Sequence, residues 1–234
     1  MRLKPECCAI IVAAGNSTRM GSISKQLIPL CDIPVIIRTI SAFENSEIID
    51  NIVIVCRQED ISLISGYIKK YKLKKVFKIV KGGSTRQQSV EAGIREAKIT
   101  AEYFAIHDGA RPLITEQEIT ASVKDCIKYK ASALAVPVKD TIKIIGHDNF
   151  IKSTPQRSLL WAVQTPQVFE RNLYLKALEK AKNENMDYTD DCQLVEHIGA
   201  KVHLCRGTYT NIKLTTLEDV YIAESILKSR EEGK

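Results

Sequence analysis

The loop AAGNSTRMGSISKQ at residues 13–26 carries the residue types that hold anions, and it follows a short apolar run. Gly15 would let backbone amides approach a ligand, while Arg19 and Lys25 place two cations in one loop, as the charge of a triphosphate requires. The segment is not a P-loop, because it contains no G-x-x-x-x-G-K-S/T, and it lacks the third glycine of a dinucleotide-binding fingerprint. Considered alone, the same residues could form an ordinary exposed turn.

A second candidate segment, GGSTRQQS at residues 82–89, follows another apolar run and leads into a helical pattern. Paired glycines, hydroxyls and the start of a helix offer hydrogen-bond partners to a base and a ribose. The candidate ligand-binding residues in this segment are Gly83, Ser84, Arg86 and Ser89. A turn followed by a helix N-cap is the structural alternative.

The segment HDGARP at residues 107–112 places a carboxylate at the end of a further apolar run. Asp108 is well placed to hold Mg²⁺, because this ion prefers oxygen ligands and usually shares them with substrate phosphates. Arg111 could instead simply pair with Asp108. We interpret His107 as a core histidine rather than a catalytic base.

Two basic residues later in the chain, Lys213 and Arg157, could bind phosphoryl groups. Lys213, in the segment Asn-Ile-Lys at 211–213, could return to the same sheet edge, although a solitary lysine is normally a solvated surface charge. Arg157 has a planar guanidinium, which suits a phosphate monoester. We group it with Thr141 and Thr165, because all three lie on or just beyond the segment at about 139–160. An interface salt bridge is the alternative role for Arg157.

The segment MDYTDD ends in two adjacent carboxylates, Asp190 and Asp191. Because they open a predicted helix behind Thr189, we interpret them as complements of the helix dipole rather than as site residues.

Alternating strands and helices must position these residues. The apolar, strand-length runs lie at residues 7–13, 52–56, 76–80, 103–107 and 133–138. Helical patterns between them include 34–43, 59–70 and a segment from a capping box at 115–118 to about 130. This order predicts an α/β fold with a mostly parallel sheet between helices, and such sheets bind ligands beyond the carboxyl ends of their strands.

One segment, at about 139–160, departs from this alternation. Two β-type stretches flank the turn-rich Gly-His-Asp-Asn at 146–149, which predicts a projecting β-hairpin. An isolated hairpin needs a surface to pack on, and a second subunit is a natural candidate. Further helices are expected at about 170–182, 189–198 and from 217, with a strand at 202–205, all within one domain spanning 1–234.

Composition excludes several classes of protein. The net charge of +6 favours anionic ligands but is too mild to require nucleic acid. The seven cysteines include no C-x-x-C pair, so neither a disulfide framework nor a zinc site is indicated. No apolar run approaches the length of a membrane helix, and no signal peptide is apparent, so we expect a cytoplasmic protein.

The order of the motifs is more specific than any one of them. The series AAGNSTRMG, KQ, GGSTRQQSV, HDGARP, VKDTIK, WAVQTPQVF, TDD and NIKLTTLEDV, over about 8–226, resembles the 2-C-methyl-D-erythritol 4-phosphate cytidylyltransferase family. This resemblance implies a Rossmann-like three-layer nucleotidyltransferase domain that forms a homodimer through the β-arm. It also implies transfer of a cytidylyl group from CTP to methylerythritol phosphate, with release of pyrophosphate.

The resemblance assigns roles to the candidate residues. Arg19, Lys25 and Lys213 would be catalytic and would hold the phosphates, and Asp108 would position Mg²⁺. The CTP-binding residues would be Ala13, Ala14, Gly15, Gly83, Ser84, Arg86, Ser89 and Gly109. The acceptor phosphate would be bound by Thr141, Arg157, Arg111 and Thr165, with the first two delivered by the arm of the partner subunit.

Two alternatives are carried forward. Ribitol-5-phosphate cytidylyltransferase would share the fold and the CTP site but use another polyol phosphate. A noncatalytic nucleotide-binding or RNA-binding module would need neither Lys25 nor Lys213 for chemistry, and it should interleave aromatic with basic residues. Because only 6% of the residues are aromatic, the second alternative is the weaker one.

Overall fold

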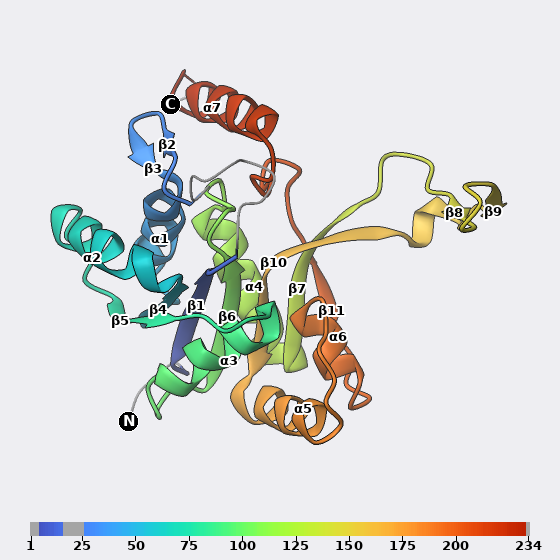
Figure 1. Cartoon of the computed structure of the whole chain (residues 1–234), viewed down its shortest axis with the longest axis horizontal. Coiled ribbons are helices and arrows are strands. Elements are labelled where there is room, and N and C mark those ends of the chain that lie inside the picture. Colours follow the sequence, from blue (N-terminus) through green and yellow to red (C-terminus); the bar gives the residue numbers. More distant parts are fainter. Residues whose placement is uncertain (1–4, 16–25, 233–234) are drawn as a thin grey trace.

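The computed structural model describes residues 5–15 and 26–232 (Figure 1). Arg19 and Lys25, the two cations predicted in the first loop, lie outside these residues.

A seven-stranded sheet forms the centre of the molecule. In spatial order its strands are β11 (His203–Arg206), β7 (Ala131–Pro137), β10 (Trp161–Glu170), β6 (Tyr103–Asp108), β1 (Cys7–Ala13), β4 (Asn51–Cys56) and β5 (Val76–Lys81). Only β10 runs antiparallel to its neighbours in this sheet. The central strands β1 and β4 are apolar and almost wholly buried because helices cover both faces of the sheet. The predicted, mostly parallel sheet is therefore confirmed.

Helices form the two outer layers (Figure 1). One face is covered by α1 (Val35–Asn45), α2 (Ile61–Lys70) and α4 (Glu116–Tyr129), and the other by α3 (Arg86–Glu96), α5 (Arg171–Asn183) and α6 (Asp191–Glu196). The last helix, α7 (Leu217–Glu232), packs on a small third cluster beside the short strands β2 (Pro29–Leu30) and β3 (Ile33–Pro34). None of the helices within residues 5–15 and 26–232 is long and apolar enough to cross a membrane.

The helix α4 shows how local sequence sets an element's bounds. The side chain of Thr115 accepts a hydrogen bond from the backbone N–H of Glu118, and the Glu118 carboxylate accepts one from the backbone N–H of Thr115. This reciprocal arrangement satisfies two amides that the first turn leaves without helical partners. The predicted capping box is therefore confirmed, and the helix ends where Lys130 adopts a left-handed conformation, with φ of 70°.

The predicted hairpin is also confirmed. The strands β8 (Ile144–Ile145) and β9 (Ile151–Ser153) pair antiparallel, and the arm that carries them extends well away from the sheet (Figure 1). Several large apolar side chains on the arm are exposed; Phe150 and Leu159 are each 74% exposed.

The strand β10 was not anticipated from the sequence. Its first three residues are exposed and the next six are buried, and its pairing with β7 is irregular between Val163 and Gln167. Pro166 interrupts the run, and proline is uncommon within a central strand, so the sequence pattern does not indicate a strand here. The strand matters because it places Thr165 and Gln167 beside the end of β6.

Gly93 allows α3 to lie directly on the sheet, and this contact predicts a clear stability difference. A Cβ at this position would lie 2.6 Å from Ile10 Cγ2 and 2.7 Å from Val55 Cγ2. We expect Gly93→Ala to lower the free energy of unfolding by about 1–3 kcal/mol, because β1 or β4 must move. The matched control is Gly66→Ala in α2, where nothing lies within 4 Å of the added methyl. It should raise stability by about 0.5–1 kcal/mol. Urea denaturation measures both, and equal stabilities would contradict the close packing of α3.

Candidate active site

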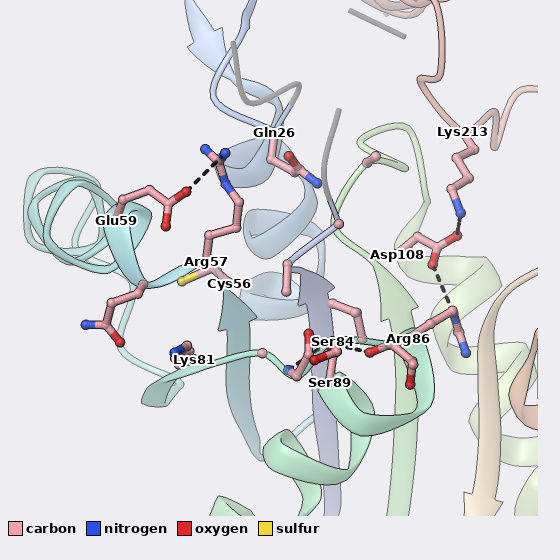
Figure 2. Close-up of a pocket in the computed structure, with 18 residues that line it drawn as sticks. Gln26, Cys56, Arg57, Glu59, Lys81, Ser84, Arg86, Ser89, Asp108 and Lys213 are labelled. Atoms are coloured by element: carbon pink, nitrogen blue, oxygen red, sulfur yellow. Dashed lines mark hydrogen bonds and ion pairs between the residues drawn. The ribbon is translucent and has the colours of Figure 1, made fainter. Parts of the chain in front are cut away.

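A pocket of about 520 Å³ opens at the carboxyl ends of the parallel strands (Figure 2). Its lining includes residues at or just beyond the ends of four adjacent strands: Ala14 after β1, Cys56 on β4, Lys81 on β5 and Asp108 on β6. These ends converge because parallel neighbours point the same way, which is why ligands bind at this edge of α/β sheets. Segments predicted separately along the chain therefore share one cavity.

The loop after β5 forms one wall of the pocket. A Cβ on Gly82 would overlap the Cβ of Ala14, so glycine is needed for the loop to approach the end of β1 this closely. The backbone N–H of Gly83 donates to Ser89 Oγ at 3.1 Å, and that hydroxyl donates to the carbonyl oxygen of Thr85 at 2.8 Å. Thr85 is the N-cap of α3. The loop is thus a capped turn and also a pocket wall, so the two interpretations of this segment are compatible.

Asp108 lies at the opposite side of the pocket, surrounded by positive charge. Its carboxylate is 2.9 Å from Lys213 Nζ, 3.4 Å from Arg111 Nε and 3.9 Å from Arg86 Nε. Burial disfavours the ionised form, but the charges of Lys213, Arg86 and Arg111 outweigh it and hold the pKa of Asp108 well below its usual range. The site therefore presents one fixed negative charge among three cations.

Hydrogen bonds across the fold bring Lys213 to this position. Arg111 Nη1 donates to the carbonyl oxygen of Asn211 at 2.7 Å, and the N–H of Leu214 donates to the carbonyl oxygen of Ala110 at 2.8 Å. The buried amide of Asn211 in turn donates to the carbonyl oxygen of Thr165 at 3.0 Å. These bonds tie the segment after β11 to the end of β6 and to the middle of β10, so Lys213 is held at the site although it lies beyond the last strand.

His107 and Thr165 form a hydrogen-bonded group beside the backbone of Asp108. Thr165 Oγ accepts from the backbone N–H of Asp108 at 3.0 Å and lies 3.0 Å from His107 Nδ1, while His107 Nε2 lies 3.2 Å from the carbonyl oxygen of Arg111. A neutral ring with its proton on Nε2 satisfies all of these contacts. Complete burial lowers the pKa of His107 to about 4, which agrees with a core histidine rather than a general base.

Comparison with known proteins identifies the family. The family model described as 2-C-methyl-D-erythritol 4-phosphate cytidylyltransferase (IspD) matches residues 7–229. The chain belongs to this cytidylyltransferase family. A relative of that name from Caldanaerobacter subterraneus subsp. tengcongensis is 48% identical over 222 residues, which cover 94% of this chain and 98% of the relative. Another, from Clostridium novyi, is 46% identical over 224 residues, covering 95% of this chain and 96% of the relative.

A solved structure agrees with the family model. The crystal structure of 4-diphosphocytidyl-2C-methyl-D-erythritol synthase from Anaerococcus prevotii matches with a TM-score of 0.86 at 32% identity. The match covers 96% of this chain and 99% of that chain.

Most of the residues singled out from the sequence surround the pocket of this cytidylyltransferase. Its lining includes Ala14, Gly15, Gly83, Ser84, Arg86, Ser89, Asp108 and Lys213. Ala13 and Gly109 are buried behind that lining, and Arg111 and Thr165 contact Asp108 from outside it. Thr141 and Arg157 belong to the arm, which extends away from the central sheet (Figure 1) and contributes no residue to the pocket lining. The Arg157 guanidinium donates to the carbonyl oxygen of Lys139 at 3.0 Å.

Sequence reasoning missed the charged pocket residues Arg57, Glu59 and Lys81 of this cytidylyltransferase, and it missed the contact of Asp191 with Arg86. Arg57 lines the pocket on the side away from Asp108 (Figure 2), and the Asp60 carboxylate binds its guanidinium through two contacts, at 2.8 and 3.0 Å. The sequence signal that could have identified Arg57 is its position directly after the strand β4. Asp190 is the N-cap of α6 and Asp191 lies in its first turn, in agreement with the helix-dipole interpretation, but Asp191 is also buried with its carboxylate against Arg86. No sequence pattern marks that contact.

Proposed function

We propose that the protein transfers a cytidylyl group from CTP to 2-C-methyl-D-erythritol 4-phosphate, releasing pyrophosphate, as a step of isoprenoid precursor biosynthesis. The observation that carries this proposal is the pocket in which Asp108, with its three neighbouring cations, faces a capped glycine loop. Such a pocket offers hydrogen-bond partners for a nucleoside at one wall and positive charge for phosphates at the other. Family membership supports the identity of both substrates.

In this proposal the glycine loop and the end of β1 bind the nucleoside of CTP. The contacting residues are Ala14, Gly15, Gly83, Ser84, Arg86 and Ser89, with Ala13 and Gly109 packing behind them. Arg19 and Lys25 bind the triphosphate, an assignment supported by their flanking residues Gly15 and Gln26, which both line the pocket.

The chemistry follows from electrostatics. An oxygen of the acceptor phosphate attacks the α-phosphorus in line with the departing pyrophosphate, and both reactants are anionic, so their repulsion must be neutralised before they meet. Lys213 holds the α-phosphate as charge develops there, together with Arg19 and Lys25. A phosphate monoester is largely ionised near neutral pH, so the site needs no strong general base. The neutral, buried His107 is compatible with this.

Asp108 is the residue that would hold a divalent cation. Enzymes of this family generally use such an ion, and we propose Mg²⁺. The donor set fits, because Mg²⁺ commonly takes one or two protein carboxylates and completes its shell with substrate phosphates and water. Within residues 5–15 and 26–232 no cluster of three His, Cys, Asp or Glu residues forms a self-sufficient metal site. When bound, the ion supplies further positive charge to the phosphates of CTP.

For the acceptor site we propose a homodimer in which the arm of each subunit reaches the pocket of the other. Thr141 and Arg157 of the arm then bind the acceptor phosphate opposite Arg111 and Thr165. The apolar side chains exposed on the arm support a packing partner for it. We also place the reaction in the cytoplasm, a proposal supported by the seven cysteines, which all lie within the described residues and form no disulfide there.

The decisive test measures pyrophosphate release with CTP and Mg²⁺ and compares methylerythritol phosphate with ribitol 5-phosphate as acceptor. Release with methylerythritol phosphate alone is expected. Release only with ribitol 5-phosphate would reassign the acceptor, and release with neither would overturn the enzymatic function.

The arm predicts a substrate-specific defect. Arg157→Ala should raise the KM for methylerythritol phosphate by about tenfold or more, with little change in the KM for CTP, because a charge-assisted contact to the acceptor phosphate alone is lost. Steady-state kinetics with each substrate varied in turn checks this. Mixing the Arg157→Ala and Arg19→Ala variants should restore part of the activity, since one pocket in the mixed dimer keeps both arginines. Equal effects on both KM values, or no rescue despite proven subunit exchange, would contradict the crossed arm.

A further inference from the structure

We propose that Asp191, a buried carboxylate outside the pocket lining, is a positioning residue that holds Arg86 beside Asp108. This inference rests on the proposed cytidylyl transfer, because Arg86 is assigned there to the CTP site.

The side chain of Arg86 bridges two carboxylates on different elements. Arg86 is the first residue of α3, and Figure 2 shows its guanidinium directed toward Asp108 at the end of β6. Its Nε lies 3.9 Å from Asp108 Oδ1, whereas its Nη1 lies 2.6 Å from Asp191 Oδ2 at the start of α6. The closer contact is therefore with Asp191, the carboxylate that does not line the pocket.

The Asp191 carboxylate is itself fixed by its surroundings. The residue is 2% exposed, and its Oδ1 accepts a hydrogen bond of 2.6 Å from the hydroxyl of Tyr174 in α5. Burial and the Asp191 charge raise the pKa of Tyr174 above its ordinary value, so the hydroxyl keeps its proton and donates. On β10, Gln167 Oε1 accepts from the backbone N–H groups of Asp191 and Cys192 at 3.0 and 3.1 Å. Contacts from α5 and β10 thus fix the Asp191 carboxylate and the backbone that carries it.

This anchoring matters because arginine has a long, rotamer-rich side chain. The Arg86 side chain is 25% exposed, and without Asp191 its remaining charged contact is the 3.9 Å approach to Asp108. Part of its conformational freedom would return, and its guanidinium could move toward solvent or onto Asp108. Either movement changes the arrangement of charge around Asp108. Groups that orient a residue at a reactive centre in this way commonly affect activity by about tenfold to hundredfold.

The neighbouring Asp190 provides a matched control. Asp190 is the N-cap of α6, where its carboxylate accepts from the backbone N–H of Gln193 at 2.9 Å and from Gln167 Nε2 at 3.2 Å. It stabilises the same helix but makes no ion pair with Arg86. Asp190→Asn therefore reports on loosening of α6 alone, whereas Asp191→Asn removes the charge that Arg86 contacts.

The test is a double-mutant cycle in the full-length protein, read as kcat/KM for CTP in the pyrophosphate assay together with the melting temperature. Asp191→Asn should lower kcat/KM by about tenfold to hundredfold, while Asp190→Asn should change it by less than about threefold. In an Arg86→Met background, Asp191→Asn should cause no further loss of activity, because its effect acts through Arg86. The double variant should also melt above Arg86→Met, which leaves the Asp191 carboxylate buried without its cation.

Three results separate failure of this inference from failure of the proposed function. An inactive wild-type protein would overturn the proposed function. With an active wild type, equal activities of the Asp190→Asn and Asp191→Asn variants, or independent losses from Arg86→Met and Asp191→Asn, would overturn the positioning role. If Asp191→Asn does not fold, Tyr174→Phe replaces it in the cycle; it should lower kcat/KM severalfold with Arg86 present and leave it unchanged in the Arg86→Met background.

Discussion

Lys213→Met is expected to lower kcat/KM for CTP by about a hundredfold or more, by analogy with the loss of one preorganised donor to a developing negative charge. The Lys213 ammonium lies 2.9 Å from Asp108 and lines the pocket, so it is already in place before substrate arrives. A methionine of similar length keeps the aliphatic contacts and removes only the charge. Pyrophosphate release under steady-state conditions measures the loss.

Stability should hardly change in this variant. The Lys213 side chain is 40% exposed, and the buried Asp108 carboxylate keeps Arg111 and Arg86 as charged neighbours, so we expect a loss of about 1 kcal/mol. Lys180→Met is the matched control, because that side chain is 44% exposed and lies 3.9 Å from Glu184 in α5, outside the pocket. It should retain activity within about twofold. Full activity of Lys213→Met, or an equal defect in Lys180→Met, would remove Lys213 from the proposed chemistry.

Asp108→Asn should damage both activity and stability, in contrast to Lys213→Met. We expect kcat to fall by about a hundredfold or more, because the carboxylate that we propose as the ligand of a divalent cation loses its charge. The free energy of unfolding should fall by about 3 kcal/mol, because Arg111 and Arg86 keep their positive charges after a shared buried partner is neutralised. Pyrophosphate release and urea denaturation measure the two effects.

The control for Asp108 is Asp125→Asn. Its carboxylate lies 2.9 Å from His203 Nδ1 at the edge strand β11, and it is not part of the pocket. This variant should match the wild type in activity and lose less than about 1 kcal/mol of stability. If Asp108→Asn were as stable as the wild type, the three cations around that carboxylate would not depend on it, and the electrostatic description of the site would be wrong.

Much of the scaffold was predictable because its signals are local. The run of apolar residues in β1 indicates a strand that is buried on both faces, and the Thr115–Glu118 capping box indicates where α4 begins. Glycines and polar residues after successive strands place the candidate ligand-binding groups at one sheet edge, since parallel strands end at the same edge. The sequence by itself therefore determined the strand and helix alternation, the arm, and eight residues of the pocket lining.

Only the tertiary structure decided how the charges are paired. The Lys213–Asp108 contact joins residues about a hundred positions apart, and it depends on the bond of Asn211 to Thr165 within β10 and the bond of Leu214 to Ala110 just after β6. Likewise, Asp191 contacts Arg86 because β10 inserts antiparallel between β6 and β7, and its Gln167 fixes the start of α6. Periodicity and capping depend on neighbours within a few residues, whereas an ion pair depends on the positions of whole elements. The sequence could therefore place Asp108, Arg86, Lys213 and Asp191 on their elements, and only packing determined which of them meet.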